Sequence, residues 1–288
     1  MFVIIKFYKM AKKISFLITL LFLTTFSFAQ KKEKIKGSKI VTVALKEINS
    51  FENIEVSDNF EVLLVKGNQP SLEIEADDNL HDIINFEVAG NTLRINALKD
   101  ASSFKKFTVR INYSENLKLI IARNETTIKA LADLELDNIT IKNYDDSKSF
   151  LNVKSNYFSL ILDDKSEAEI NVKAENTNLE LSKNSELKAL VASPEVKIDM
   201  YQKSEATIEG NTANAKIRLD NTSNLVAQKF IIGNLELDTE NYSKCEVNVS
   251  SSIQITAAGK SQIELFGEPK ITIEKFTNNA TLYKKEKK

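Results

Sequence analysis

A serine recurs through the second half of the chain at nearly constant spacing. Successive serines are separated by 19, 19, 19, 19, 20 and 18 residues. The positions are Ser147, Ser166, Ser185, Ser204, Ser223, Ser243 and Ser261. A fixed period of this length indicates a repeat architecture, in which each unit stacks on its neighbours. No other feature of the 288 residues constrains the fold as strongly.

Apolar residues flank every serine at fixed distances. Six residues before the serines stand Ile141, Leu160, Leu179, Ile198, Ile217, Leu237 and Ile255. Four residues after them stand Leu151, Ile170, Ala189, Ile208, Ala227, Val247 and Leu265. Polar residues alternate with these positions, which is typical of β-strands with one buried face. Each repeat therefore predicts two short strands joined by a turn. We also expect an earlier repeat, with Leu119 in the first apolar column and Glu125 in the serine position.

Strands at this period, without helical periodicity, predict an all-β solenoid of stacked coils. At about 3.3 Å per residue, a coil has a perimeter of about 60 Å, and each coil adds about 4.8 Å to the stack. An up-and-down antiparallel sheet is the alternative. It does not readily explain why serine and apolar positions keep one register over seven repeats.

Two residue types that could attract functional interpretations fit the repeat as structural residues. The only cysteine, Cys245, stands two residues after a serine in an apolar column, so we expect it to be buried and unreactive. A single cysteine also excludes an internal disulfide. The serines share the parity of the inward columns. We therefore expect their hydroxyls to point into the coil and to bind backbone groups at a corner.

Residues 39–113 precede the regular repeats and predict a different arrangement of strands. The expected strands are Lys39–Ala44, Phe51–Val56, Phe60–Val65, Ser71–Ala76, Phe86–Val88, Thr92–Ala97 and Phe107–Tyr113. Turns containing Gly67 and Gly90 separate two pairs of them. We expect this region to cover one end of the solenoid, since an uncovered coil exposes an unpaired strand edge. Ile271, Ile273 and Leu282 predict a weak last repeat at the other end.

Residues 1–29 have the pattern of a secretory signal peptide. Four lysines precede an apolar run over residues 14–28, and Ser27-Phe28-Ala29 forms a small-x-small cleavage site. The run is shorter than the roughly 20 residues that span a bilayer, although an uncleaved anchor is the alternative. We therefore divide the chain into a signal peptide (1–29), an irregular N-terminal β region that caps the solenoid (30–115), and solenoid repeats with a basic tail (116–288). The protein is expected to be exported to the periplasm, the outer surface or the medium.

Composition argues against several function classes. The chain has 39 Lys+Arg against 40 Asp+Glu, so it lacks the basic excess that binding to nucleic acid requires. Its one histidine, His81, excludes multi-histidine metal sites, and residues 79–83 predict a polar surface turn or short helix around it. We expect no cofactor, no metal and no nucleic-acid partner.

Outward-facing columns offer the candidate sites. Five residues before the serines stand Lys142, Ile161, Glu180, Asp199, Arg218, Asp238 and Thr256. The carboxylates around Arg218 would suit a polysaccharide-processing enzyme of the pectate-lyase type, but an ion-pair ladder on a solvated face explains them equally well.

Two further columns carry residues that could bind a cation or a sugar. Glu167, Glu186 and Glu205 follow successive serines, and would either bind a cation or splay into water beside Lys165, Lys183 and Lys203. We favour splayed side chains. Tyr144 and Tyr201 could stack on a sugar, but ordinary surface tyrosines are the simpler interpretation. We assign no catalytic, cofactor-binding or metal-ligating residue.

Four stretches resemble the opening of the head GIN domain family of putative auto-transporter adhesins, formerly a domain of unknown function. They are Phe51–Val56, Phe60–Gly67, Asn79-Leu80 and Asn91–Ile95. The resemblance covers roughly residues 51–265 and implies a right-handed parallel β-helix exported by Bacteroidetes-type bacteria. The chain differs from the family in having fewer glycines at the coil corners.

Together these observations predict an exported, non-enzymatic β-solenoid of the cell envelope that acts as an interaction module. Its partner would be an unknown surface glycan or an envelope protein. Two alternatives stay open: a polysaccharide-processing enzyme that uses Glu180, Asp199, Arg218 and Asp238, and a purely structural periplasmic protein.

Overall fold

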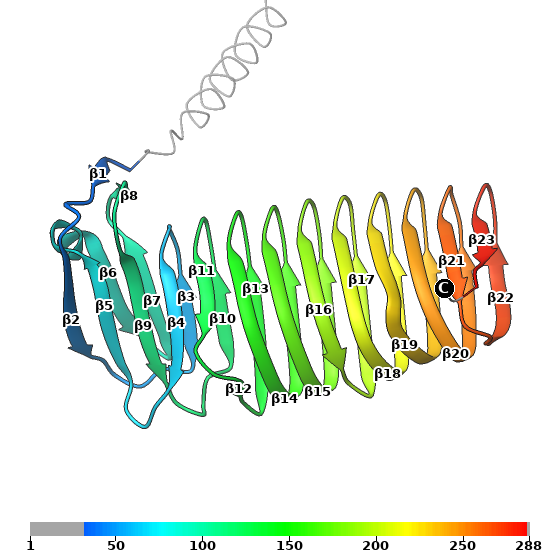
Figure 1. The fold of residues 1–288 in the computed structure, drawn as a ribbon, viewed down its shortest axis with the longest axis horizontal. Coiled ribbons are helices and arrows are strands. Elements are labelled where there is room, and N and C mark those ends of the chain that lie inside the picture. Colours follow the sequence, from blue (N-terminus) through cyan, green and yellow to red (C-terminus); the bar gives the residue numbers. More distant parts are fainter. Residues whose placement is uncertain (1–31, 287–288) are drawn as a thin grey trace, which may run out of the picture. The chain divides into compact units, whose positions relative to one another are not determined.

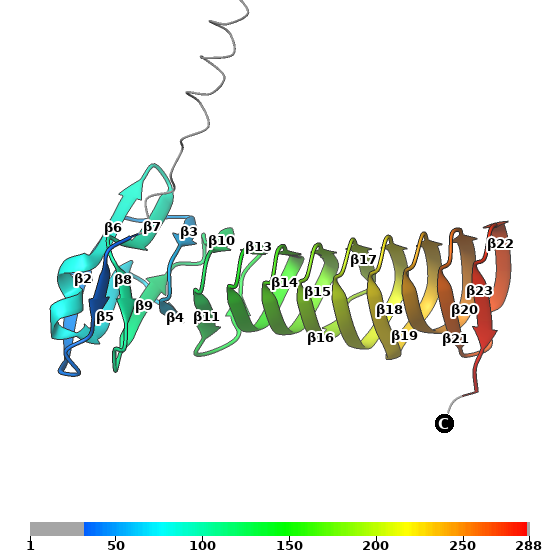
Figure 2. The ribbon, with the colours of Figure 1, turned by 90° about the horizontal axis from the view of Figure 1, so that it is seen from above.

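The computed structural model describes residues 32–286, which fold into a stack of β-coils (Figure 1). Most coils contribute one strand to each of two faces, which lie on opposite sides of the stack in Figure 2 and which we call the A face and the B face. This is the all-β solenoid that the 19-residue period predicts, and the fold prediction is confirmed. The segment interpreted as a signal peptide lies outside the described residues.

The A face contains the strands that end at the tight turn before each serine. Along the stack they are β6 (Ile84–Ala89), β7 (Thr92–Ala97), β3 (Asn53–Val56), β10 (Leu119–Ala122), β13 (Asn138–Asn143), the second halves of β14 (Lys148–Leu162) and β15 (Glu167–Leu181), β17 (Glu195–Met200), the second halves of β18 (Glu205–Leu219), β19 (Asn224–Thr239) and β20 (Lys244–Ala257), and β22 (Lys270–Phe276). Only the first pair, β6 and β7, is antiparallel.

The B face contains the strands that follow each serine. Along the stack they are β2 (Val41–Glu47), β5 (Ser71–Asp77), β9 (Phe107–Tyr113), β4 (Glu61–Lys66), β11 (Thr127–Ala130), the first halves of β14 and β15, β16 (Glu186–Ala192), the first halves of β18, β19 and β20, β21 (Gln262–Phe266) and β23 (Thr281–Lys284). The pairs β2–β5 and β5–β9 are antiparallel, and the pairs from β9 onward are parallel.

Short elements complete the described part of the chain. Strand β12 (Leu134–Glu135) pairs with β14 at the corner between the two faces, on the lower edge of Figure 1. Strand β1 (Lys34–Lys36) pairs with β8 (Asp100–Ser102), and η1 (Asp78–Ile83) is a 3₁₀-helix. All seven strands expected over residues 39–113 are present, with ends shifted by a few residues, whereas β1 and β8 were not expected.

A residue with positive φ makes the tight turn of each coil, two positions before the serine. These residues are Asn124, Asp145, Asp164, Lys183, Gln202, Asn221, Asn241, Gly259 and Asn278, with φ between 57° and 74°. Asn and Asp tolerate the left-handed region better than other side chains do, so most coils turn without glycine. The turns at Asn124 and Asn278 place Thr126 and Ala280 in the serine column.

The expected earlier repeat exists, but its register was predicted one residue too early. Strand β10 pairs Ile120, not Leu119, with Ile141. Ile120 is fully buried and Leu119 is partly exposed, and Thr126, not Glu125, occupies the serine position. A slip of one residue moves every side chain to the opposite face, and the 21-residue spacing between Thr126 and Ser147 concealed the register.

The inward columns form the core, as their period predicts. The aliphatic column from Ile141 to Ile255 is at most 1% exposed. Cys245 is 2% exposed, and burial raises the pKa of its thiol. Its assignment to the core is therefore confirmed.

The repeated serines point inward and are all buried, but most of their hydroxyls do not bind backbone groups as we expected. Ser147 Oγ donates to Ala122 O at 3.1 Å, and Ser261 Oγ accepts from Thr239 Oγ1 at 3.2 Å. Within residues 32–286, the other five hydroxyls have no hydrogen-bond partner: Ser166, Ser185, Ser204, Ser223 and Ser243.

The backbone at the corner is already paired from coil to coil. Glu167 N donates to Ser147 O, Lys165 N to Asp145 O, and Asp163 N to Asn143 O. Because the ladder continues through the turn, these corner backbone groups already have partners and do not need the hydroxyl to satisfy them. The prediction assumed that the ladder breaks there.

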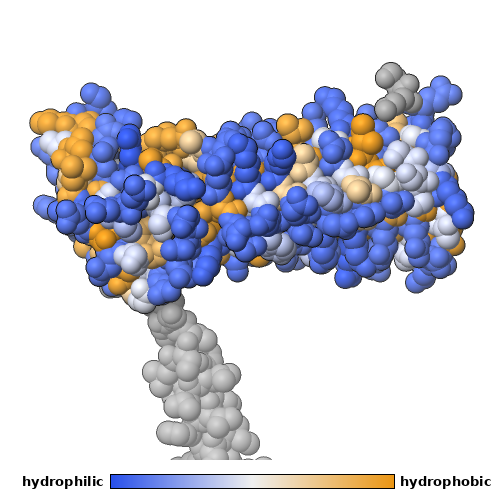
Figure 3. Space-filling model, turned by 90° about the horizontal axis from the view of Figure 1, so that it is seen from below, coloured by the Kyte–Doolittle hydropathy of each residue, from blue (hydrophilic) through white to orange (hydrophobic). Residues whose placement is uncertain are grey.

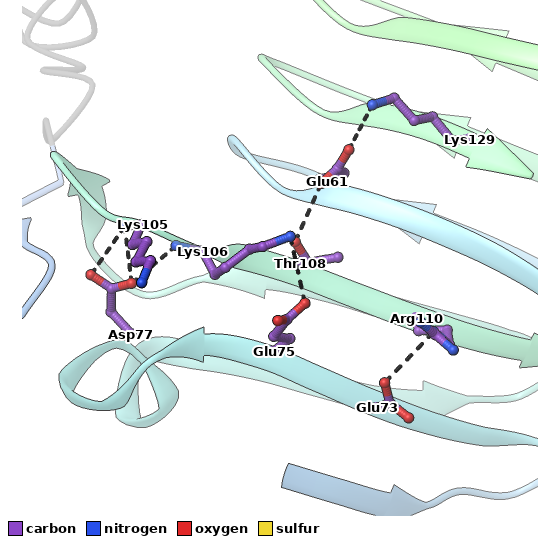
Figure 4. A network of polar contacts seen from close by, with 9 residues as sticks. All are labelled: Glu61, Glu73, Glu75, Asp77, Lys105, Lys106, Thr108, Arg110 and Lys129. Atoms are coloured by element: carbon purple, nitrogen blue, oxygen red, sulfur yellow. Dashed lines mark hydrogen bonds and ion pairs between the residues drawn. The ribbon is translucent and has the colours of Figure 1, made fainter. Parts of the chain in front are cut away.

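At the N-terminal end, a buried carboxylate joins three segments around β5 (Figure 4). Asp77 accepts hydrogen bonds from the backbone N–H groups of Lys39, Lys105 and Lys106 at 2.8 to 3.0 Å. Burial alone would raise the pKa of the Asp77 carboxyl, but these donors outweigh it and hold the pKa below its usual range.

The expected last repeat is present but exposed. Ile271 and Ile273 of β22 pair with Ile253 and Ile255, and Leu282 of β23 pairs with Ile263. Ile271 and Ile273 remain 42% and 52% exposed because no further coil among the described residues covers them.

Candidate functional site

A groove of about 730 Å³ runs along the A face across successive coils. We call it the amide groove. Its two columns of outward residues stand nine and seven positions before the serines. The first column is Tyr157, Asn176, Glu195, Asn214, Asn234, Ser252 and Lys270, and the second contains Asn178, Lys197, Lys216, Glu236, Gln254 and Thr272.

The β-ladder positions these side chains. Parallel, in-register pairing places equivalent residues of successive coils next to each other, about 4.8 Å apart. For example, Asn214 pairs with Asn234, and Asn234 pairs with Ser252. Residues at alternate positions of one strand point to the same side, so each coil presents two neighbouring polar side chains.

Hydrogen bonds between coils hold several of these side chains in place. Asn214 Nδ2 donates to Glu195 Oε1 at 2.6 Å, and Asn234 Nδ2 donates to Asn214 Oδ1 at 3.0 Å. Ser252 Oγ donates to Asn234 Oδ1 at 2.8 Å. An amide nitrogen has two N–H groups, so each asparagine keeps one donor for another partner.

The charged residues of the amide groove are largely paired. Lys216 Nζ lies 2.6 Å from Glu236 Oε1, and Lys197 Nζ lies 2.5 Å from Asp199 Oδ2. The hydrogen bond that Lys197 donates to the Asp199 carboxylate raises the pKa of Lys197, so this lysine stays protonated at neutral pH. The groove therefore has fixed polar groups without a large excess of either charge.

Two other grooves are present in the described part of the chain. The corner groove, about 1070 Å³, follows the edge of the stack near β12 and includes Lys66, Glu135, Lys154 and Pro194. Figure 3 views the stack from this side and shows mostly hydrophilic residues, with hydrophobic patches between them. The Phe150 groove, about 540 Å³, lies on the B face beside the exposed side chains of Phe150 and Leu190.

The carboxylate column proposed for an enzyme is assembled as the register predicts, but it does not line these grooves. Arg218 stands between Asp199 and Asp238 in the ladder. Its guanidinium, however, lies 5.8 Å from the centre of the Tyr201 ring, and Asp199 pairs with Lys197. Within the described residues, Arg218 therefore forms no ion pair with Asp199 or Asp238, and the expected ion-pair ladder is not formed at this arginine.

The glutamate column is also assembled, with different partners from those expected. Glu167 pairs with Glu186, and Glu186 with Glu205, in register. Glu167 binds Lys148 at 2.8 Å and Glu186 lies 3.5 Å from Lys188.

The predicted lysine partner Lys183 instead binds Asp163 and Asp164. Because Lys183 lies within a turn, its side chain reaches the carboxylates in the turn of the preceding coil more easily than it reaches a glutamate on a strand. Over residues 32–286, no group of three or more His, Cys, Asp or Glu side chains is placed to hold a metal ion.

The two tyrosines considered as sugar platforms each contact an arginine. The Arg123 guanidinium lies 4.5 Å from the Tyr144 ring centre, and Arg218 approaches Tyr201 in the same way. Cation–π contacts of this kind cover one ring face, so neither tyrosine offers a free platform on that side. His81 lies in η1, and its Nε2 is 2.9 Å from Thr42 Oγ1.

The amide groove was not expected from the sequence. A signal was present, because Asn176, Asn214 and Asn234 stand at one position of the repeat. That their column borders a hollow is a property of the folded surface, and residue spacing does not show it. Within the described residues there is no helix of the length and hydropathy needed to cross a membrane.

The fold and the stacked polar columns define a β-solenoid with extended outer surfaces. The chain matches the family described as "Putative auto-transporter adhesin, head GIN domain" over residues 50–269. This match covers most of the 288 residues, so the chain belongs to that family and the resemblance is confirmed.

Solved structures share the fold. A protein described as a putative adhesin from Parabacteroides merdae is 18% identical with a TM-score of 0.62, covering 89% of this chain and all of its own. A putative adhesin from Parabacteroides distasonis is 19% identical with a TM-score of 0.63, covering 87% of this chain and all of its own.

A protein of the latter species described as a putative lipid binding protein is 16% identical with a TM-score of 0.61, covering 89% of this chain and all of its own. At these identities the comparisons support the fold alone. No curated protein matches the chain.

Proposed function

We propose that this protein is an exported, non-enzymatic interaction module of the cell envelope with an adhesin-like role. The observation that carries the proposal is the amide groove, which presents ordered polar side chains over seven successive coils. Such a surface suits contact with a long partner, because each coil adds a similar set of contacts. Membership in the head GIN domain family supports the same role.

The arrangement around Arg218 favours binding over catalysis. A lyase or hydrolase needs an acid or base within hydrogen-bond reach of its substrate, usually in a cleft. Asp199 is paired with Lys197, and neither Asp199 nor Arg218 lines the amide groove. Replacing Glu180 by Ala is expected to leave partner binding intact, because this exposed side chain lies outside the amide groove, whereas an enzyme that uses this face would lose turnover on acidic polysaccharides.

Protease accessibility of the native protein tests the proposed location and role. We expect a protease added to intact cells to digest the protein, as it should for a surface module. Protection on intact cells, with digestion only after the outer membrane is permeabilised, would place the protein in the periplasm and contradict the adhesin-like role. A known periplasmic protein in the same cells provides the control for membrane integrity.

A further inference from the structure

We infer that the amide groove binds a neutral, extended polysaccharide of β-linked pyranose units, laid along the stack of coils. The inference rests on the proposed function and names the partner of the same site. It follows from the length of the groove, from the hydrogen-bonding groups that line it, and from the pairing of its charges.

The repeat spacing suits a polymer of sugar rings. Neighbouring coils are about 4.8 Å apart, and one pyranose unit of an extended β-1,4-linked chain has a similar length. The groove residues run in register from Tyr157 of β14 to Lys270 of β22. Successive rings can therefore face equivalent side chains on successive coils.

The groove offers both donors and acceptors, which is what hydroxyl groups require. Side-chain amides and hydroxyls predominate among its uncharged polar residues: Asn176, Asn178, Asn214, Asn234, Gln254, Ser252 and Thr272. The bonds from Asn214 to Glu195 and from Asn234 to Asn214 fix the orientation of two amides before any ligand arrives. Side chains that are already ordered lose less entropy on binding.

The paired charges favour an uncharged ligand. Lys216 with Glu236, and Lys197 with Asp199, form compact ion pairs at 2.6 and 2.5 Å. An anionic polysaccharide would have to compete with these carboxylates for the lysines, whereas a neutral chain can hydrogen-bond to the pairs without breaking them.

An aromatic ring marks one end of the groove. Tyr157 is 41% exposed and stands in the same column as Asn176, its register partner on the next coil. Tyrosine combines an apolar ring face with a polar hydroxyl, so it can stack on a sugar ring at the end of the bound chain. The exposed apolar side chains of Phe150 and Leu190 belong to the Phe150 groove on the B face, so they are not part of this site.

Calorimetric titration of the purified protein with cellohexaose and chitohexaose tests the inference, with hexagalacturonate as the charged probe. We expect at least one neutral hexasaccharide to bind and hexagalacturonate to bind more weakly. Because two asparagines would lose their hydrogen bonds, the double variant N214L/N234L should weaken binding at least about tenfold.

Matched variants distinguish the loss of contacts in the groove from a general loss of folding. Asn171→Leu changes an exposed asparagine of β15 on the B face and should leave affinity unchanged. Tyr157→Ala leaves the hydrogen bonds of Asn214 and Asn234 in place. It should therefore weaken binding without loss of the fold, even if the double variant is poorly folded. Circular dichroism of each variant reports whether the fold is kept.

Three results would overturn the inference. The first is no binding of either neutral hexasaccharide at millimolar concentration. The second is binding that Tyr157→Ala and N214L/N234L leave unchanged, and the third is a preference for hexagalacturonate. Protease digestion on intact cells does not depend on the ligand, so the surface role can survive a failure of this inference.

Discussion

Buried polar side chains inside the solenoid differ in whether hydrogen bonds compensate their burial. Asp77 accepts from three backbone N–H groups, and Ser147 donates to a carbonyl. The hydroxyl of Ser185 is equally buried but has no partner within the described residues. A buried polar group with no partner costs stability, whereas a paired one contributes a little. A serine at this repeat position can therefore stabilise the fold in one coil and destabilise it in another.

Replacing Ser185 by Ala is expected to leave the free energy of unfolding unchanged or to raise it by up to about 1 kcal/mol, because an uncompensated hydroxyl is removed. Ser147→Ala is the matched variant, and it should lower the free energy by about 1 kcal/mol through loss of the bond to Ala122 O. Urea denaturation followed by circular dichroism measures both. Equal destabilisation by the two changes would contradict this account.

Replacing Asp77 by Asn is expected to lower the free energy of unfolding at pH 7 by about 1–3 kcal/mol, since an amide nitrogen would face backbone donors. The pKa of Asp77 is lowered in the folded state, so its stabilisation is present above the unfolded pKa of about 4 and is lost as the pH falls through the folded pKa. The difference between the two proteins should therefore shrink in acid.

Denaturation of both proteins at pH 7 and at pH 3 measures this difference. Glu75→Gln provides the control, because its pair with Lys106 at 3.6 Å is solvent-exposed and should contribute little. A difference that stays constant over this pH range would refute the role assigned to the Asp77 carboxylate.

Strands and turns follow the same plan in every coil, with a few glycines at irregular points. Gly210 lies in β18, where the register with β19 shifts between Thr207 and Gly210. Its φ is 112°, and a Cβ there would lie 2.1 Å from Val191 O of the adjacent strand. Here glycine allows two backbones to approach closely. Asparagine, which serves in the ordinary turns, would not fit at this position because its Cβ would clash with Val191 O.

Gly210→Ala is expected to destabilise the protein by more than about 2 kcal/mol, because the strand must move to accept the methyl group. Gly90→Ala is the control. Gly90 also has positive φ, at 59°, but nothing lies within 4 Å of an added Cβ, so its cost should be only about 1 kcal/mol. Thermal denaturation compares the two, and equal shifts would mean that backbone strain alone decides the outcome.

The solenoid as a whole depends on contacts between neighbouring coils. Central strands such as β15 have a coil on both sides, whereas β22 and β23 have one on a single side among residues 32–286. Every residue of β22 is exposed. Stability in a stacked repeat is approximately a sum of local and nearest-neighbour terms, so it should fall toward this end.

Amide hydrogen exchange is expected to show this gradient, with β22 and β23 exchanging fastest among the strands of the coils and β15 among the slowest. Mass spectrometry of peptides from the labelled protein measures it. Uniform protection from β15 to β23 would mean that the coils open only together, contrary to a sum of nearest-neighbour terms.

The sequence by itself determined the coils, their inward columns, the buried state of Cys245 and all the strands expected over residues 39–113. These features depend on period and parity, which are properties of neighbouring residues along the chain. The register of the first regular repeat was misplaced because residues 120 and 119 differ in parity but are both aliphatic.

Only the tertiary structure decided where the outer columns border grooves and which side chains meet across coils. Glu167 binds Lys148 instead of a turn lysine, and Asp199 binds Lys197 instead of Arg218, because long flexible side chains reach several neighbours at similar cost. The antiparallel strands β2, β5 and β6 likewise depend on where the chain reverses. The period places equivalent residues of the amide groove in columns, but its hollow shape depends on how side chains from separate coils pack in three dimensions, which residue spacing does not show.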